Sequence, residues 1–153
     1  MKISRVIIGS DHAGFDFKQS AINQLKDQKI EVEDVGTHSK EPCDYPDPAM
    51  KVAEAVSEGK ADRGVLICGS GIGMSIVANK FPGIRAALVH DAETAKLSRR
   101  HNDANVLILG ERVLDPRRIP EILSAWLETE FEGGRHQRRL DKIKSLEKKL
   151  FKR

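Results

Sequence analysis

The chain has 153 residues, of which 39% are hydrophobic and 32% are charged, and its formal net charge is +3. This length and ordinary composition predict one globular domain over residues 1–153, and they exclude a disordered or fibrous chain. No apolar stretch approaches the roughly 18 residues of a membrane span, and Cys43 and Cys68 alone cannot form a disulfide framework. Since the N-terminus also lacks a signal-peptide pattern, we expect a cytoplasmic protein with no membrane partner.

The positive charge is confined to one end of the chain. Residues 132–153 contain nine Lys/Arg and three Asp/Glu and so carry +6, which leaves −3 for the rest. This segment repeats apolar residues among its charges at Leu140, Ile143, Leu146 and Leu150. A narrow apolar stripe on a charged helix is typical of a helix laid across another surface. We therefore predict that a C-terminal helix over about 134–152 reaches a partner subunit.

Apolar runs bounded by turn residues predict five strands, and the second, whose residues alternate in polarity, is expected at a half-exposed edge. They are residues 3–10, 31–35, 64–67, 85–89 and 106–109. Helical spacing predicts helices between them, the first with Phe15, Ile22 and Leu25 as its apolar face. The second helix follows a polar loop over 36–48, the fourth has Asp91 as its N-cap, and Pro116 starts the fifth.

This alternation of strands and helices predicts a single-domain, doubly wound (Rossmann-like) α/β fold with a five-stranded parallel sheet. In such sheets ligands bind outside the carboxyl ends of the strands. Asp11 and His12 follow the first predicted strand, Cys68 follows the third, and Glu111 and Arg112 follow the fifth. We therefore expect these turns to lie together on one edge of the sheet.

The stretch around Cys68 is the most informative part of the sequence. Three glycines, Gly69, Gly71 and Gly73, follow the cysteine within five positions, between a buried strand and a helix. Glycines at such a turn let the backbone approach a ligand, and the free N–H groups of the helix start favour an anion. The same field favours the thiolate of Cys68. The spacing is neither a dinucleotide fingerprint nor a P-loop. An inert core role for Cys68 is the alternative.

Six short motifs, in this order along the chain, resemble those of the type B ribose-5-phosphate isomerases, a group that is similar to the isomerases of allose 6-phosphate and galactose 6-phosphate. They are Gly9-Ser10-Asp11-His12-Ala13-Gly14, Asp44-Tyr45-Pro46, Cys68-Gly69-Ser70-Gly71-Ile72-Gly73, Ala78-Asn79-Lys80, Arg100-His101-Asn102 and Gly134-Arg135-His136-Gln137. The resemblance runs from residue 3 to about residue 146. It implies interconversion of ribose 5-phosphate and ribulose 5-phosphate, a step of the pentose phosphate pathway.

The resemblance also implies roles for individual residues. Cys68 matches the base that moves a proton between C1 and C2, His101 matches the histidine that opens the sugar ring, and Ser70 matches the hydroxyl that shifts protons between O1 and O2. The residues matching the family's substrate-binding positions are Asp11, His12, Tyr45, Gly69, Gly71, Gly73, Ser75, Asn102, Arg112, Arg135 and Arg139. A structural role is the alternative for each histidine in isolation.

The resemblance implies a pocket shared by two subunits, so we expect a homodimer, or a homotetramer, with a small phosphorylated sugar as the ligand. Neither a metal nor an organic cofactor is expected. Three alternatives remain: an isomerase of 6-phosphohexoses, a sugar-phosphate-binding module without turnover, and a nucleic-acid-binding protein. The last is disfavoured, because the basic segment carries leucine and isoleucine instead of the aromatic residues that stack on bases. We therefore expect no nucleic-acid partner.

Overall fold

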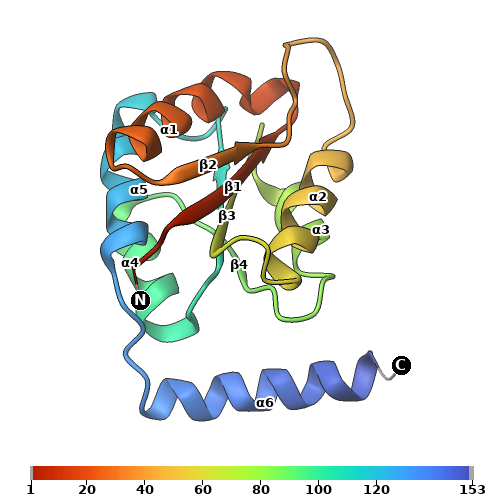
Figure 1. Ribbon diagram of the computed structural model, residues 1–153, viewed down its shortest axis with the longest axis vertical. Coiled ribbons are helices and arrows are strands. Elements are labelled where there is room, and N and C mark those ends of the chain that lie inside the picture. Colours follow the sequence, from red (N-terminus) through yellow and green to blue (C-terminus); the bar gives the residue numbers. More distant parts are fainter. Residues whose placement is uncertain (1, 152–153) are drawn as a thin grey trace.

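The computed structural model describes residues 2–151, which form one parallel five-stranded sheet between two layers of helices (Figure 1). The order of the strands in the sheet is β2-β1-β3-β5-β4. All four pairings are parallel, as predicted from the alternation of strands and helices. The strands are β1 (Arg5–Ser10), β2 (Glu31–Asp34), β3 (Arg63–Cys68), β4 (Ala86–Leu88) and β5 (Val106–Gly110).

The helices divide between the two faces of the sheet according to their apolar sides. One buried cluster packs α1, α4 and α5 on one face, and a second cluster packs α2 and α3 on the other (Figure 1). The central strands β1, β3 and β5 are almost fully buried, which explains their continuous apolar runs. The helices are α1 (Phe15–Asp27), α2 (Pro46–Ser57), α3 (Ile72–Ala78), α4 (Ala92–Asn102), α5 (Ile119–Glu128) and α6 (Arg135–Leu150).

The chain reverses its direction across the sheet at β1. It passes from β1 to β2 on one side and then crosses back to β3 on the other side of β1. The connections that leave the carboxyl ends of β1 and β3 therefore go to opposite faces of the sheet, to α1 and to α3. They leave a crevice between them, which is the place where ligands bind in open α/β sheets. Asp11 and Cys68 stand at those two ends.

Several predicted boundaries change by a few residues. The polar loop is shorter than predicted, because α2 begins at Pro46, where proline fits the first helical position. Pro116 opens a short 3₁₀ turn, η2 (Pro116–Arg118), and α5 follows from Ile119. A similar 3₁₀ turn, η1 (His12–Gly14), follows β1. The edge strand β2 is half exposed, as expected, and Asp91 caps α4 by accepting the N–H of Thr94 at 2.6 Å.

The apolar face predicted for α1 is wrong in part. Ile22 and Leu25 are buried, but Phe15 is only half-buried and Phe17 takes its place in the core. Lys18, a charged residue, is completely buried on the same helix. Its Nζ lies 2.7 Å from both carboxylate oxygens of Asp34, at the end of β2. This pair compensates for the desolvation of the ammonium group.

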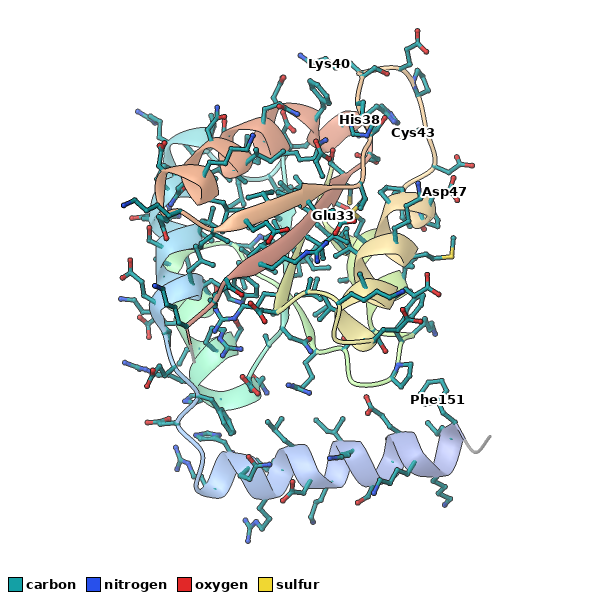
Figure 2. The ribbon with its side chains drawn as sticks, viewed as in Figure 1. Glu33, His38, Lys40, Cys43, Asp47 and Phe151 are labelled. Atoms are coloured by element: carbon teal, nitrogen blue, oxygen red, sulfur yellow. The ribbon has the colours of Figure 1, made fainter. Side chains whose placement is uncertain are left out.

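The same aspartate fixes the start of the loop that joins β2 to α2. Asp34 accepts the N–H of Gly36 at 2.9 Å, so the buried pair links α1, β2 and this loop. Figure 2 shows His38, Lys40 and Cys43 along the loop beyond this point. Lys40 adds a second, exposed link to α1 through Asp16 at 2.9 Å. The loop therefore reaches α2 along a path fixed by α1.

The last helix, α6, stands apart from the two helical layers (Figure 1). The side chains of Ile143, Leu146 and Leu150 are 42%, 53% and 67% exposed, so the predicted stripe is present but is not buried by this chain. The carboxylate of Glu147 accepts the N–H of Gly83 at 3.1 Å and ties the helix to the body. None of the helices in residues 2–151 combines the length and apolar character that crossing a bilayer requires.

The Lys18–Asp34 pair gives a test of the fold. We expect Asp34→Ala to lower the free energy of unfolding by about 3 kcal/mol, because it leaves a buried ammonium group without a counterion. Lys18→Met should cost less, since the apolar chain fills the same space and Asp34 has some solvent access. The exposed pair serves as the control: Asp16→Ala should cost less than about 1 kcal/mol. Urea denaturation measures all three, and an equal loss for Asp34→Ala and Asp16→Ala would contradict the assignment.

Candidate active site

The turn after β3 places the sulfur of Cys68 beside backbone donors. Cys68 is the last residue of β3, and Gly71, which precedes α3, has a left-handed backbone with φ +80°. Its N–H donates to Sγ of Cys68 at 3.1 Å. A Cβ at Gly71 would stand 2.4 Å from a methyl group of Leu88, so both the conformation and the space require glycine. The turn thus holds the thiol against a backbone N–H donor.

Cys68 lies at the boundary between the core and a surface hollow. Its side chain belongs to the apolar cluster under α2 and α3 and is 5% exposed, yet it also lines a hollow of about 440 Å³. This volume lies within the range of small-ligand sites. The hollow opens at the crevice between β1 and β3. Its lining residues are Asp11, His12, Ala13, Tyr45, Cys68, Gly69, Ser70, Gly73, Arg112 and Val113.

His12 is held in one orientation by the loop that precedes α2. Its Nδ1 accepts the backbone N–H of Cys43 at 3.1 Å. In the neutral ring the proton is therefore on Nε2, which leaves Nε2 as a hydrogen-bond donor. The sequence predicts no role for Cys43, because no motif marks a contact made by a backbone N–H alone.

Tyr45, at the end of the same loop, covers the start of α3. A Cβ at Gly73 would lie 2.6 Å from Cζ of the tyrosine ring, so the ring packs directly against the glycine backbone. Tyr45 remains 40% exposed and forms part of the wall of the hollow. The glycine at position 73 therefore serves close packing of a pocket residue.

Arg112 approaches the hollow from the end of β5. The N–H groups of Glu111 and Arg112 donate to the carbonyls of Cys68 and Gly69, both at 2.9 Å. These bonds fix the turn after β5 against the turn after β3. They bring the guanidinium so close to Gly69 that a Cβ there would lie 3.2 Å from Nη1. A cation thus stands beside the candidate thiolate, where an anionic ligand would find it.

Gly71 and Ser75, which were predicted to bind the substrate, do not line the hollow. The hydroxyl of Ser75 donates to the carbonyl of Ile72 at 2.8 Å, and Gly71 faces Cys68 and Leu88 more than the open hollow. The side chain of Glu111 does not line the hollow either. Its carboxylate accepts the N–H of Phe17 at 3.3 Å, and burial raises the pKa of the Glu111 carboxyl group. Ser70, by contrast, lines the hollow and its hydroxyl is exposed at the helix start.

The remaining predicted residues lie elsewhere in this chain. They occur near the last turn of α4 and the first turns of α6, and none of them lines the hollow of Cys68. Because α4 starts at the carboxyl edge of the sheet and runs back, its last turn lies towards the opposite edge. The residues concerned are His101, Asn102, Arg135 and Arg139.

A compact cluster forms around the first of these residues. The rings of His101 and His136 stack with centroids 4.2 Å apart and planes 13° apart. Oε2 of Glu132 lies 3.7 Å from Nε2 of His101 and 3.5 Å from Nε2 of His136. Desolvation, and then the charges of His101 and Arg135, lower the pKa of His136, which favours the neutral form of its ring.

Glu132 was missed by sequence reasoning. The signal that could have found it is the spacing of four between Glu132 and His136 across the glycine pair. The position of the carboxylate also depends on a backbone contact, since the N–H of Glu132 donates to the carbonyl of Arg100 at 3.1 Å. No sequence pattern encodes that contact.

Comparison with known proteins shows the family and the fold of this chain. The sequence profile described as Ribose/Galactose Isomerase covers residues 6–143. The chain belongs to the ribose/galactose isomerase family. A curated relative, ribose-5-phosphate isomerase B of Escherichia coli, is 46% identical over 96% of this chain and 99% of its own length.

Solved structures of family members have the same fold. A ribose-5-phosphate isomerase B of Clostridium thermocellum is 51% identical, with a TM-score of 0.93, over 95% of this chain and 99% of its own. The enzyme of Mycoplasma genitalium, solved with bound ribulose-5-phosphate, is 41% identical, with a TM-score of 0.92, over 97% and 99% of the two chains. The doubly wound fold predicted from the sequence is therefore confirmed.

Proposed function

We propose that this member of the ribose/galactose isomerase family interconverts D-ribose 5-phosphate and D-ribulose 5-phosphate through an enediolate. The observation that carries the proposal is the sulfur of Cys68, hydrogen-bonded to the Gly71 N–H in a hollow at the switch point of the sheet. The names of the Escherichia coli relative and of the ligand-bound Mycoplasma genitalium structure support this choice of substrate. The hollow, about 440 Å³, suits a small sugar phosphate.

In the proposed mechanism the thiolate of Cys68 is the base. It removes the proton on C2 of the open-chain aldose as the carbonyl at C1 becomes the enediolate, and it returns that proton to C1. The hydroxyl of Ser70 carries the second proton between O1 and O2, so no atom is gained or lost. A positioned base accounts for a rate factor of about 10²–10⁴.

The larger part of the barrier is the negative charge that forms on the enediolate oxygens. In the turn over 69–73, the N–H groups of Gly71 and Ile72 already donate to the sulfur of Cys68 and the hydroxyl of Ser70. The other N–H groups of the turn are fixed in place before the reaction, and each such donor is worth about 3–4 kcal/mol in comparable sites. The guanidinium of Arg112 adds positive charge next to Gly69. His12 and Asp11 would hold hydroxyl groups of the sugar, with Tyr45 as the wall.

We infer that a complete site needs a second subunit. The sugar of ribose 5-phosphate is mostly cyclic, so a proton donor must open the ring, and His101 is the residue that the family resemblance assigns to this step. It lies in the last turn of α4, away from the hollow of its own chain. The partner's copy of this turn would bring the imidazole to Cys68, together with Asn102, Arg135 and Arg139 for the sugar and its phosphate.

Two exposed apolar surfaces support a homodimer. Ile72 and Ile76 project from α3, beside the hollow, and are 56% and 57% exposed. The apolar stripe of α6 lines an open groove of about 710 Å³ between this helix and the body of the same chain. In a two-fold dimer, a contact between one patch of the first chain and a different patch of the second chain occurs a second time with the chains exchanged. α3 of each subunit can therefore cover the groove of the other subunit.

Assembly and location complete the proposal. Two such dimers could pair further into a homotetramer. Both cysteines of the chain are free thiols, which fits a reducing, cytoplasmic compartment. The alternative is a sugar-phosphate-binding module without turnover. It would give no chemical role to the thiol of Cys68 or the imidazole of His101, and a complete lack of isomerase turnover would favour it.

The first prediction concerns the base. Cys68→Ala should lower kcat by about 10³-fold or more, because no other group in the turn can accept the C2 proton. The melting temperature and the binding of inorganic phosphate should stay close to those of the native chain. Cys43→Ser is the matched control and should keep its activity, since only the backbone of Cys43 contacts His12. Full turnover by Cys68→Ala would rule out the proposed base.

The second prediction concerns substrate choice within the family. We expect kcat/KM for ribose 5-phosphate to exceed the values for allose 6-phosphate and galactose 6-phosphate by at least about tenfold, because a longer sugar must displace its phosphate from the arginines. A coupled assay of the three aldose phosphates measures the ratio. If kcat/KM is higher for either hexose phosphate, ribose 5-phosphate is not the preferred substrate. That result would not affect the proposed enediolate mechanism.

The third prediction tests the shared site. Cys68→Ala and His101→Asn should each be nearly inactive alone. After the two are unfolded together and refolded as a mixture, half of the dimers contain one intact site of two, so about one quarter of native activity should return. Refolding each variant alone is the control. If the mixture stays as inactive as its components, Cys68 and His101 do not act across a subunit interface.

A further inference from the structure

We propose that His136 is a positioning residue, which holds the imidazole of His101 and the guanidinium of Arg135 at one fixed separation. The imidazole serves the ring-opening step and the guanidinium serves the phosphate of the same substrate molecule. This inference deepens the proposed function and rests on it for the roles of those two groups.

The ring of His136 contacts the two groups through different parts of itself. Its face stacks on the ring of His101, with centroids 4.2 Å apart and planes 13° apart. Its edge accepts a hydrogen bond, because Nε of Arg135 donates to Nε2 of His136 at 3.4 Å. His101 belongs to the last turn of α4, and Arg135 is the first residue of α6. One side chain therefore links the two turns that carry the two functional groups.

The chain holds this ring as a buried support beneath an exposed group. The side chain of His136 is 6% exposed, whereas that of His101 is 35% exposed. The N–H of His136 donates to the carbonyl of Gly133 at 3.0 Å, and the N–H of Glu132 donates to a carbonyl in the last turn of α4 at 3.1 Å. Gly133 and Gly134 turn the chain with φ +69° and +55°, a conformation that favours glycine.

The neutral form of the His136 ring suits this role. Desolvation, and then the charges of His101 and Arg135, lower the pKa of His136. In the neutral ring the bond from Arg135 places the proton on Nδ1 and leaves the lone pair of Nε2 for the guanidinium. Oε2 of Glu132 lies 3.5 Å and 3.7 Å from the Nε2 atoms of the two rings and offsets the positive charge of the cluster. The bond uses Nε of Arg135, so its two Nη groups can still form a bidentate pair with a phosphate.

The chemistry of the substrate requires the two groups at a set separation. In the furanose form of ribose 5-phosphate, only C4, C5 and O5 lie between the ring oxygen and the phosphorus. The proton donor for the ring oxygen and the cation for the phosphate must therefore stand close together. A separation that is fixed before binding removes the entropy cost of orienting each group separately.

Two substitutions separate the two contacts of His136. His136→Phe keeps a stacked ring but removes the acceptor for Arg135, so KM for ribose 5-phosphate should rise at least about fivefold while kcat changes less than about twofold. His136→Gln keeps an acceptor near the position of Nε2 but removes the ring, so kcat should fall at least about tenfold while KM changes less than about twofold. Initial rates measure both parameters. Parallel changes in the two variants, or no change in either, would overturn the proposal.

A double-mutant cycle tests whether His136 acts through Arg135. Arg135→Gln, which alters an exposed side chain, should raise KM by itself, and His136→Phe should then add less than about twofold to KM. Full additivity of the two effects would contradict the proposal. The matched control is His90→Gln, which alters an exposed histidine outside the cluster and should keep both kcat and KM. Melting temperatures verify that each variant is folded.

A measurement on the native chain needs neither turnover nor a variant of His136. In ¹⁵N NMR spectra, Nε2 should be the unprotonated nitrogen of the neutral His136 ring, because Arg135 donates to it. A proton on that nitrogen would refute the bond to Arg135, even if every substitution at position 136 prevented folding.

Phosphate affinity separates a failure of this inference from a failure of the proposed function. The Kd for inorganic phosphate should rise at least about threefold in His136→Phe and in Arg135→Gln, and it should stay within about twofold in His136→Gln. An unchanged Kd in His136→Phe would overturn the positioning of Arg135. If the native chain does not isomerise ribose 5-phosphate, the proposed function fails, and the Kd values and the NMR spectra still decide whether His136 positions Arg135.

Discussion

The hydrogen bond from the Gly71 N–H to the sulfur of Cys68 is the contact on which the rest of the site depends. It requires a left-handed residue three positions after the end of a buried strand, and it requires that turn to lie against the end of β5. The carbonyls of Cys68 and Gly69 accept N–H groups of the β5 turn, and a Cβ at Gly110 would stand 2.6 Å from the carbonyl oxygen of Ser70. Two neighbouring strand ends thus fix the sulfur, its donor and the guanidinium of Arg112 as one unit.

The sheet, and the carboxyl edge at which the hollow lies, could be predicted from local sequence patterns. Continuous apolar runs predicted β3 and β5 as buried strands, and parallel strands bring their carboxyl ends to one edge. Asp11, Cys68 and Arg112 could therefore be placed together before any coordinates were known. The glycines marked a turn that needs both close approach and an unusual backbone, as Gly71 and Gly73 do.

Contacts between distant segments escaped sequence reasoning. Lys18 is a core residue only because Asp34, sixteen positions later, ends β2 beside it. His12 is oriented by a backbone N–H, and Glu132 is positioned by a backbone carbonyl, so neither contact leaves a trace in residue types. Helical spacing placed Phe15 on the inner face, but the first turn of α1 continues from a 3₁₀ turn and directs Phe17 inwards. Periodicity specifies a face only after the helix start is known.

The proposed division of the site between two subunits would have a physical consequence for α6. This helix is highly charged, has one thin apolar stripe and touches its own chain mainly through Glu147 and the turn around His136. An isolated helix of sixteen residues is marginal in water, so most of its order must come from tertiary or quaternary packing. If the partner supplies that packing, the interface that completes the active site also stabilises the segment that carries Arg135, His136 and Arg139. Assembly and substrate binding would then be coupled, because each orders the same first turns of α6.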